Sequence, residues 1–465
     1  MPPPVATIVF TFGILGLFVL ARDRTAQTSK ALWLPVAWLL INGSRQVSLW
    51  LRTGPRMSSL SDTGVDGSPL DAAIFGTILV AGLIVLIGRR RQVKAVLRAN
   101  LPIVMFFAYC AISIVWSDYP FVSFKRWFKA VGDIVMVLVV LTDPGTSDAV
   151  KRLLARVSFI LVPISVLLIK YYPDMSVYYD AYTGRRLVSG VAMDKNMLGM
   201  GCLVFGLGAW WQCLEAFEDL KGKERIRRLI AYGTVLTMAI WLFHMADSMS
   251  SLSNFIMGSG LIAMSRFRLA RKPAMVHLAV AAVVGVSFAA LFLQVGGGAL
   301  EAMGRNATLT GRTEIWSSLL QMSNNPLIGS GFESFWLHNK EIWARGDFLV
   351  GVNEAHNGYL EVFLNLGWIG VTLLAVLILT GYRNVTIALR QDSEAGGFRL
   401  ALFVVAIVYS FTEAGFRPLS LTWIALLLAI MVVPKNPKLN VPVSTEGQNA
   451  DVSVIAPRPA RAWVS

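Results

Sequence analysis

The sequence predicts an all-α integral membrane protein, a helical bundle that crosses the bilayer about 12–13 times. Of its 465 residues, 55% are hydrophobic and only 15% are charged. The mean hydropathy is +0.59, far above that of soluble domains. Apolar stretches of roughly 17–22 residues, the length that spans a bilayer core as a helix, recur along the chain. No Gly/Ser-rich linker separates them, which favours one membrane domain over residues 1–434.

The predicted membrane spans follow one another from the N-terminus. They lie near residues 5–21, 70–88, 101–117, 128–142, 153–169, 197–217, 229–246, 274–294, 358–382, 399–413 and 417–434, with two shorter spans near 31–42 and 250–265. The final segment, 435–465, is rich in Pro, Asn, Ser and Val without periodicity, and we expect a disordered cytoplasmic tail there.

The charge distribution predicts the orientation of the chain. A net charge of +14 would suggest nucleic acid for a soluble protein. With the N-terminus outside and the sides alternating, however, most of the 42 lysines and arginines fall in segments assigned to the cytoplasm, such as 89–98 and 221–228. This bias follows the positive-inside rule, so we expect no nucleic-acid partner. It also places the polar loop 295–357 outside the cytoplasm.

The N-terminus and the cysteines exclude other assignments. Met1-Pro2-Pro3-Pro4 lacks the basic region of a cleavable signal, and Arg22 and Arg24 follow the first apolar stretch, which predicts a retained helix. The three cysteines (Cys110, Cys202 and Cys213) lie in predicted spans without metal-ligand spacing. We therefore expect no disulfide framework, metal site or cofactor.

The loop 295–357 contains a predicted amphipathic helix. After Thr310-Gly311, apolar residues recur at Ile315, Trp316, Leu319 and Leu320, and the pattern stops before Asn324-Asn325-Pro326. Because the tryptophan ring and its N–H suit a membrane interface, we expect this helix along the outer membrane surface.

Arg312 occupies the first turn of this predicted helix. Backbone N–H groups are unpaired there and the helix dipole favours anions, so a cation is unfavourable unless an anion joins it. A bound phosphate would resolve the conflict. The alternative is an exposed arginine that pairs with Glu314 or with lipid headgroups.

A second outer segment, residues 170–195, combines arginines with aromatic side chains. Tyrosines that include Tyr182 surround Thr183-Gly184-Arg185-Arg186, and the segment ends at Asp194-Lys195-Asn196. Guanidinium groups bind phosphate oxygens in pairs, and aromatic rings offer faces to sugars. An ordinary aromatic belt with interfacial arginines explains the same pattern equally well.

His356 differs from the other histidines by its position before a predicted span. The positive end of the helix dipole disfavours imidazolium, which would keep a neutral ring able to accept a proton. Glu354 and Glu361 could oppose this by stabilising the cation. The alternative role is an interfacial hydrogen bonder.

Three motifs together resemble the O-antigen ligase and Wzy-type polymerase family, which includes exopolysaccharide polymerases. They are Gly311-Arg312-x-x-x-Trp316, Asn325-Pro326-Leu327-Ile328-Gly329-x-Gly331 and His356-Asn357-x-Tyr359-Leu360. The resemblance extends upstream to Arg186-x-x-Ser189-Gly190 and Asn196-x-Leu198-Gly199.

The resemblance implies a metal-independent, inverting glycosyl transfer from an oligosaccharide linked to undecaprenyl diphosphate. Arg186 and Arg312 would hold the diphosphate, with Arg185 as the alternative to Arg186, and His356 would activate the acceptor hydroxyl or orient the reacting groups. The remaining candidate substrate-binding residues flank these: Arg185, Tyr182, Asn196, Glu314, Trp316, Asn357 and Tyr359. A chain-length regulator and export proteins are possible partners besides membrane lipid.

The family pattern does not distinguish a polymerase from a ligase that transfers glycan to lipid A-core. It also does not identify the sugars involved. Similarity around Asp118 and Asp194 favours the exopolysaccharide polymerase. A lipid-linked oligosaccharide flippase is the alternative from another class. A flippase needs charges along a path through the spans, and only Lys129, Asp133, Asp247 and Glu413 lie near one.

Overall fold

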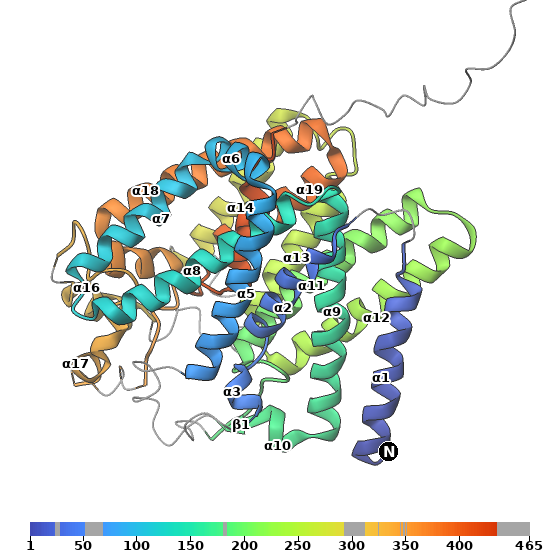
Figure 1. Ribbon diagram of the computed structural model, residues 1–465, viewed down its shortest axis with the longest axis horizontal. Helices are drawn as coiled ribbons and strands as arrows, with labels where there is room; N and C mark the ends of the chain where they lie inside the picture. The colour runs from blue at the N-terminus through green and yellow to red at the C-terminus, as the bar shows by residue number, and fades with distance from the viewer. Residues whose placement is uncertain are drawn as a thin grey trace, which may run out of the picture.

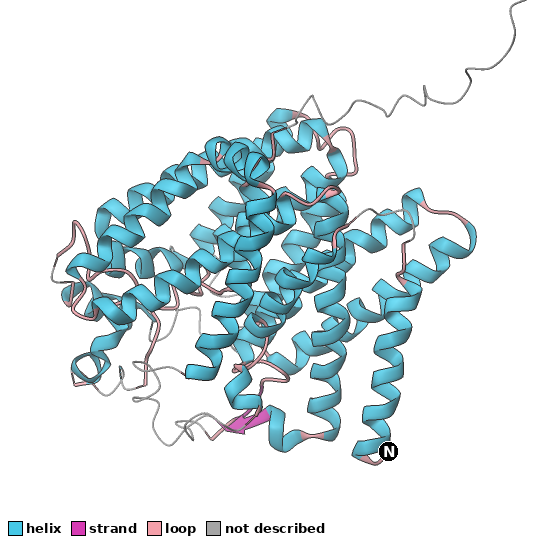
Figure 2. Ribbon diagram, in the orientation of Figure 1, coloured by secondary structure: helices cyan, strands magenta, loops and turns pink. Residues whose placement is uncertain are grey.

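The computed structural model describes residues 1–23, 28–51, 68–179, 184–292, 312–323, 325–344, 346, 349 and 351–434. Helices account for nearly all of the regular structure, as Figure 2 shows. They are α1 (Pro3–Leu20), α2 (Trp33–Asn42), α3 (Val47–Trp50), α5 (Pro69–Gly88), α6 (Arg90–Ala99), α7 (Leu101–Ile112), α8 (Pro120–Leu141), α9 (Thr146–Tyr171), α10 (Pro173–Ser176), α11 (Lys195–Asp219), α12 (Gly222–Ala246), α13 (Met249–Met264), α14 (Pro273–Phe292), α16 (Arg312–Gln321), α17 (Asn339–Trp343), α18 (Gly358–Gln391), α19 (Ser393–Tyr409) and α20 (Leu421–Ile430).

Strands form one small antiparallel hairpin between α10 and α11. β1 (Val177–Tyr179) pairs with β2 (Arg186–Val188), with Val177 opposite Val188 and Tyr179 opposite Arg186. Short 3₁₀ helices cover Lys30–Leu32, Ser113–Trp116 and Phe335–His338. The expected all-α, multi-pass membrane bundle is confirmed, and each predicted apolar stretch overlaps a helix in the described residues.

The number of helices that qualify as spans is smaller than the 12–13 expected. Among the described residues, seven are long and apolar enough to cross a membrane, or eight if Arg90–Ala99 and Leu101–Trp116, bent by 90°, form one span. Two physical reasons account for the difference. α8 carries Lys125, Arg126, Lys129 and Asp133, and three apolar helices are short: Lys30–Asn42, Met249–Met264 and Leu421–Ile430.

The core of the bundle lies around α19 and α20. All residues of α20 are buried, and α19 is buried from Phe398 to Tyr409 except at Arg399. α8, α11, α13 and α18 pack around these two helices (Figure 1). Trp211 of α11 stacks on Phe398 of α19 with ring centroids 4.2 Å apart. α1 and α14 lie at the periphery, since only 11% and 6% of their most apolar windows are buried.

A break in α18 receives the Asn325–Gly331 motif. Gly367 adopts φ +62°, which interrupts the helical backbone and leaves its hydrogen-bonding groups open. The motif supplies the missing partners from both sides of the break: Ser330 N donates to Leu364 O, Gly331 N to Asn365 O, Trp368 N to Pro326 O and Ile369 N to Leu327 O, at 2.8–3.1 Å.

Glycine is required on both sides of this contact. A Cβ on Gly367 would lie 2.3 Å from the carbonyl carbon of Leu327, and a Cβ on Gly329 would lie 2.4 Å from that of Asn365. Both glycines also have positive φ. The docked motif therefore fixes the loop before α18 relative to the first turns of that helix.

Candidate functional site

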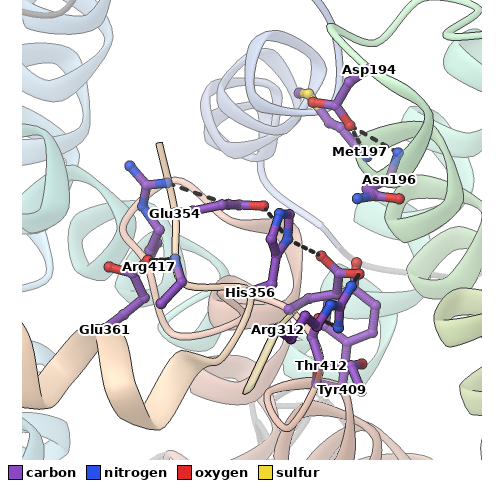
Figure 3. Close-up of polar contacts among 12 residues, drawn as sticks. Asp194, Asn196, Met197, Arg312, Glu354, His356, Glu361, Tyr409, Thr412 and Arg417 are labelled. Carbon is purple, nitrogen blue, oxygen red and sulfur yellow. Dashed lines mark hydrogen bonds and ion pairs between the residues drawn. The ribbon is translucent and has the colours of Figure 1, made fainter. Parts of the chain in front are cut away.

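The candidate site lies where the end of the long loop, the start of α11 and the segment between α19 and α20 meet (Figure 3). Asn357 caps α18, because its side-chain oxygen accepts hydrogen bonds from the backbone N–H groups of Tyr359 and Leu360. Asp194 caps α11 in the same way through Asn196 and Met197. Two capped helix N-termini therefore flank the site.

Glu354, His356 and Glu413 form its centre, and we call them the acid–histidine cluster. Nδ1 of His356 lies 2.9 Å from Glu354 Oε1 and 3.3 Å from Glu413 Oε2. His356 has φ +48°, an uncommon left-handed conformation for a non-glycine residue. The side chain of Glu413 is only 7% exposed, so its charge requires partners within the protein.

Two arginines complete the ion pairing of this cluster. Arg312 donates from Nη1 to the Thr412 carbonyl at 2.6 Å and lies 3.5 Å from Glu413 Oε1 through Nη2. Arg417 lies 3.5 Å from Glu354 Oε2 and 3.6 Å from Glu333 Oε2. Although burial alone would lower it, the pKa of Arg417 is raised by the surrounding carboxylates. Cations and carboxylates therefore alternate through the site.

The charge state of His356 differs from the sequence-based interpretation. Burial disfavours the imidazolium, but the hydrogen bonds to Glu354 and Glu413 outweigh it and raise the pKa of His356 to about 10. For Glu354, burial raises the pKa, but the opposing effects of His356, Arg417 and Arg312 are larger and lower the pKa from 4.5 to about 2. The expectation that the α18 dipole keeps His356 neutral is therefore wrong, because two carboxylates face the ring.

Glu354 acts on His356 as anticipated, whereas Glu361 has a different role. The two oxygens of Glu361 accept from Ala355 N at 2.6 Å and from Trp336 Nε1 at 2.8 Å, and the residue is 3% exposed. Glu361 thus fastens the backbone directly before His356 to α18.

The helix α16 delivers Arg312 to this cluster. Trp316 Nε1 donates to the Ala355 carbonyl at 2.7 Å, one residue before His356. Leu319 is fully buried in a small apolar cluster with Phe335, Trp336 and Leu364. The predicted amphipathic helix is thus present, and its apolar face packs on the end of its own loop and on α18.

A cleft of about 290 Å³ opens beside the cluster. It is lined by Glu354, Glu413, Arg417, Asp194, Asn196 and Lys129, among others. Burial raises the pKa of Asp194, and the nearby charges of Glu354 and Glu413 add to the effect. The cleft wall therefore offers a carboxylate that is more basic than an ordinary aspartate.

A larger groove of about 790 Å³ adjoins this cleft along α5 and α8. The two cavities share Phe75, Lys129, Arg417 and Leu419 in their linings. Phe124 and Phe128 line the groove and are 48% and 41% exposed. Lys125, Arg126 and Lys129 also line it. The groove therefore combines apolar walls with cations, and two of its basic residues, Lys129 and Arg417, lie where it meets the cleft.

The structure brings together some of the predicted site residues but not all. Arg312 and His356 share Glu413, and Asn196 lines the adjoining cleft. Tyr359 donates from its hydroxyl to Ile407 O and stacks on Phe411, while Glu314 is exposed.

The predicted arginines of the second segment lie apart from the cluster. Arg186 belongs to β2, is exposed, and has no ion pair with the cluster in the described residues. Arg185 pairs with Asp247 at 2.6 Å. Tyr182 lies outside the described residues. The arginine that joins Arg312 at the cluster is instead Arg417.

Sequence reasoning missed Glu413 and Arg417 as site residues. Both follow α19 in a segment whose polar character is visible in the sequence Thr412-Glu413-Ala414-Gly415. From the sequence, Glu413 is assigned only to the charges of a transport path. A charged pair directly between two strongly apolar stretches was the available signal.

The acid–histidine cluster also has the ligand types of a metal site. Its three ligand atoms lie within 4.8 Å of one another. A proton on Nδ1 of His356 lies between the ring and the facing oxygens of Glu354 and Glu413. Arg312 and Arg417 contact the other oxygen of each carboxylate. The contacts are therefore accounted for by ion pairing, and a metal ion would have to displace that proton.

Comparisons with known proteins give two matches for this chain. Residues 233–375 match the O-antigen ligase family Wzy_C, a range that includes Arg312 and His356 but not Arg186. The chain is also 24% identical over 303 residues to the exopolysaccharide production protein ExoQ of Rhizobium meliloti (strain 1021). That match covers 63% of this chain and 66% of ExoQ, just under two thirds of its length. The resemblance to the O-antigen ligase and Wzy-type family, in its exopolysaccharide branch, is confirmed.

Proposed function

We propose that this protein polymerises exopolysaccharide repeat units by glycosyl transfer from an oligosaccharide linked to undecaprenyl diphosphate. The reaction takes place at the periplasmic face of a bacterial inner membrane. The observation that carries the proposal is the cluster of Arg312, His356 and Glu413 beside a cleft that adjoins a groove with exposed aromatic walls. Similarity to an exopolysaccharide production protein supports the same reading.

The groove along α5 and α8 suits the donor lipid. Its exposed aromatic walls accommodate a polyprenyl chain, and the cations Lys125, Arg126 and Lys129 line the same groove. A diphosphate at that end would sit between the lipid and the cleft. The attached sugar would then reach the cleft where Arg417, Glu354 and Asp194 lie.

The transfer is a single displacement with inversion. An acceptor hydroxyl oxygen forms a bond to the anomeric carbon while the bond from that carbon to the diphosphate breaks, and its electron pair goes to the diphosphate. Fixed guanidinium groups stabilise the charge that gathers there without requiring a metal ion. Arg312 is our candidate for this role, with Arg417 as the second guanidinium at the cluster. Arg186 and Arg185, which the sequence suggested as the second ligand, lie apart from it in the hairpin region.

Proton removal from the acceptor falls to a carboxylate in this proposal. A charged His356 has no free nitrogen to accept a proton, so it orients Glu354 and Glu413 and adds positive charge near the leaving group. Asp194 lines the cleft with a raised pKa and takes the hydroxyl proton as general base.

A flippase reading receives less support from the near-span charges. Asp133 accepts from Trp38 Nε1 and Leu419 N, which anchors the segment before α20. Asp247 pairs with Arg185 at the end of α12, and Glu413 belongs to the cluster. Within the described residues these three charges serve fixed contacts, and the fourth, Lys129, lines the cleft and the groove. Transport needs groups along a path through the spans.

The test uses a strain without the gene, complemented with Arg312→Ala, His356→Ala or Asp194→Asn. We expect loss of polymer and accumulation of single lipid-linked repeats on the outer face. Lys94→Gln, an exposed change on α6, serves as the matched control and should restore polymer. Repeats confined to the inner face would contradict the enzyme proposal and indicate transport.

The polysaccharide of the deletion strain separates the two enzyme readings. Absence of polymer indicates a polymerase. Finished polymer that stays on its lipid carrier indicates a ligase acting on lipid A-core. A chain-length regulator and export proteins remain proposed partners, and altered chain length in strains that lack them would support the assignment.

A further inference from the structure

A second large cavity lies at the other end of the bundle, between α1, α9 and α12. Its volume is about 670 Å³, and it is lined by Phe18, Ala21, Arg22, Asp23, Asp148, Lys151, Arg152, Ala155, Arg156, Phe159, Gln212, Arg228 and Tyr232. The C-terminal end of α9 leads through the hairpin to Asp194 in the cleft, whereas its N-terminal turns line this cavity. α9 has 26 residues and is about 39 Å long, so its two ends lie far apart.

In the described part of the chain, the arginines of α9 in this cavity form no ion pair, although Asp148 also lines the cavity and the charge of Asp143 acts on Arg156 at longer range. Arg152 donates only to neutral oxygens, those of Thr28 Oγ1 at 2.6 Å and Asp23 O at 2.8 Å. The Nη1 atom of Arg156 is buried without a hydrogen-bond partner, and its guanidinium lies 4.3 Å from the Trp33 ring. A buried, unpaired guanidinium N–H is unfavourable unless an acceptor joins it.

Their spacing increases the demand for an anion. Arg152 and Arg156 are four residues apart on one helix, where like charges face each other and destabilise the helix. The other basic residues behave differently: Lys151 pairs with Glu215, and Arg228 pairs with Asp23. The unmatched positive charge of the cavity is thus concentrated on Arg152 and Arg156, with Arg22 exposed at its rim.

The inner wall of the cavity is apolar. Phe18 meets Phe159 edge to face at 5.5 Å, and Phe159 stacks on Tyr232 at 5.7 Å. Basic side chains above an aromatic wall match a molecule that has a phosphate group joined to a hydrocarbon chain. Basic pockets between transmembrane helices on the cytoplasmic side bind anionic headgroups by this arrangement.

We propose that this cavity binds the phosphate group of an anionic phospholipid from the cytoplasmic leaflet. The phosphate oxygens accept from Arg152 and Arg156 of α9, and Arg22 at the end of α1 closes over them. The lipid thereby ties α1 to the bundle. Such a tie has a structural purpose, because α1 buries only Ala6 and Leu17 of its own residues.

The test measures thermal unfolding of the full chain in nanodiscs of phosphatidylcholine alone or with phosphatidylglycerol. We expect phosphatidylglycerol to raise the melting temperature of the wild type by about 3 °C. A parallel arm adds inorganic phosphate to the phosphatidylcholine discs, and stabilisation there would identify free phosphate as the source of the group. No stabilisation in either arm overturns the proposal.

The variant Arg152→Gln/Arg156→Gln should lose the response to phosphatidylglycerol. Lys221→Gln/Lys223→Gln removes the same charge from exposed positions at the same end and should keep it. Equal responses of both variants would indicate a general surface effect and contradict the site. Native mass spectrometry of the wild type gives a second readout that needs no variant: one retained phosphatidylglycerol is expected, and its absence contradicts the proposal.

Discussion

Replacing His356 with Gln should remove the part of the unfolding free energy that declines between pH 6.5 and pH 10 in the wild type. The pKa of His356 is raised from 6.5 to about 10 by Glu354 and Glu413, against the opposing effect of burial. A group whose pKa is raised on folding stabilises the folded state fully below pH 6.5, and this contribution disappears as the pH rises through 10. The pKa of Glu354, lowered from 4.5 to about 2, gives a contribution that is fully present above pH 4.5 and is lost as the pH falls through about 2.

The magnitude follows from the size of the shift. At 1.36 kcal/mol per pKa unit, the change at His356 corresponds to about 5 kcal/mol of unfolding free energy. Partial exposure of the ring, 31% of its side chain, reduces this to about 3 kcal/mol. The wild type should therefore exceed His356→Gln in melting temperature most strongly between pH 5 and 6.5, and the difference should shrink steadily towards pH 10.

Intrinsic tryptophan fluorescence during heating, in one detergent across pH 5–10, measures this difference. His338→Gln is the matched control, because it removes an imidazole from the same loop outside the acid–histidine cluster. Its carboxylate partner, Asp118, is 69% exposed. A difference between wild type and His356→Gln that stays constant across the pH range would refute the charged-histidine interpretation.

Three further predictions address the loop, the helix that carries Arg312, and the absence of a metal requirement. Gly367→Ala should destabilise the protein by about 2 kcal/mol or more, because a positive φ disfavours Ala and the new Cβ would clash with Leu327. Thermal unfolding measures this loss. Gly285→Ala on α14, where a Cβ meets open space, is the control that should leave stability unchanged. Trp316→Phe removes the hydrogen bond to Ala355 O, so it should lower the free energy of unfolding by about 1 kcal/mol and slow polymer formation. An unchanged rate of polymer formation would show that this contact of α16 does not matter for the reaction. Chelation with EDTA should leave glycosyl transfer by the purified protein unchanged, whereas a loss restored by a divalent cation would make the acid–histidine cluster a metal site.

The helical architecture could be predicted from the sequence because hydrocarbon-spanning stretches are long and locally encoded. Asn357 also behaves as its position before an apolar run suggests, since a cap depends on the next few residues alone. The number of qualifying spans was overestimated where helices are short or carry charges, as in α8. Length and composition cannot identify a helix that other helices shield from lipid.

The candidate site was predictable only in part because it depends on contacts between distant residues. Arg312 and His356 were selected for their local positions, and Glu413, which joins them, lies 101 and 57 residues further along the chain. The local dipole argument for a neutral His356 failed for the same reason. A neighbouring carboxylate at about 3 Å has a stronger effect on a histidine than a helix end.

The broken helix α18 explains how these distant groups are held in place. A membrane helix tolerates non-helical backbone only where other protein groups satisfy it, and the Asn325–Gly331 motif does so at Gly367. The same loop continues from this motif to His356, which directly precedes α18. The contact at the break therefore holds the loop and the start of α18 together beside the cluster. Glu361, one turn into α18, holds Ala355 from the other side. The charges that we propose to stabilise a leaving diphosphate are thus positioned before substrate binds, which is what electrostatic catalysis requires.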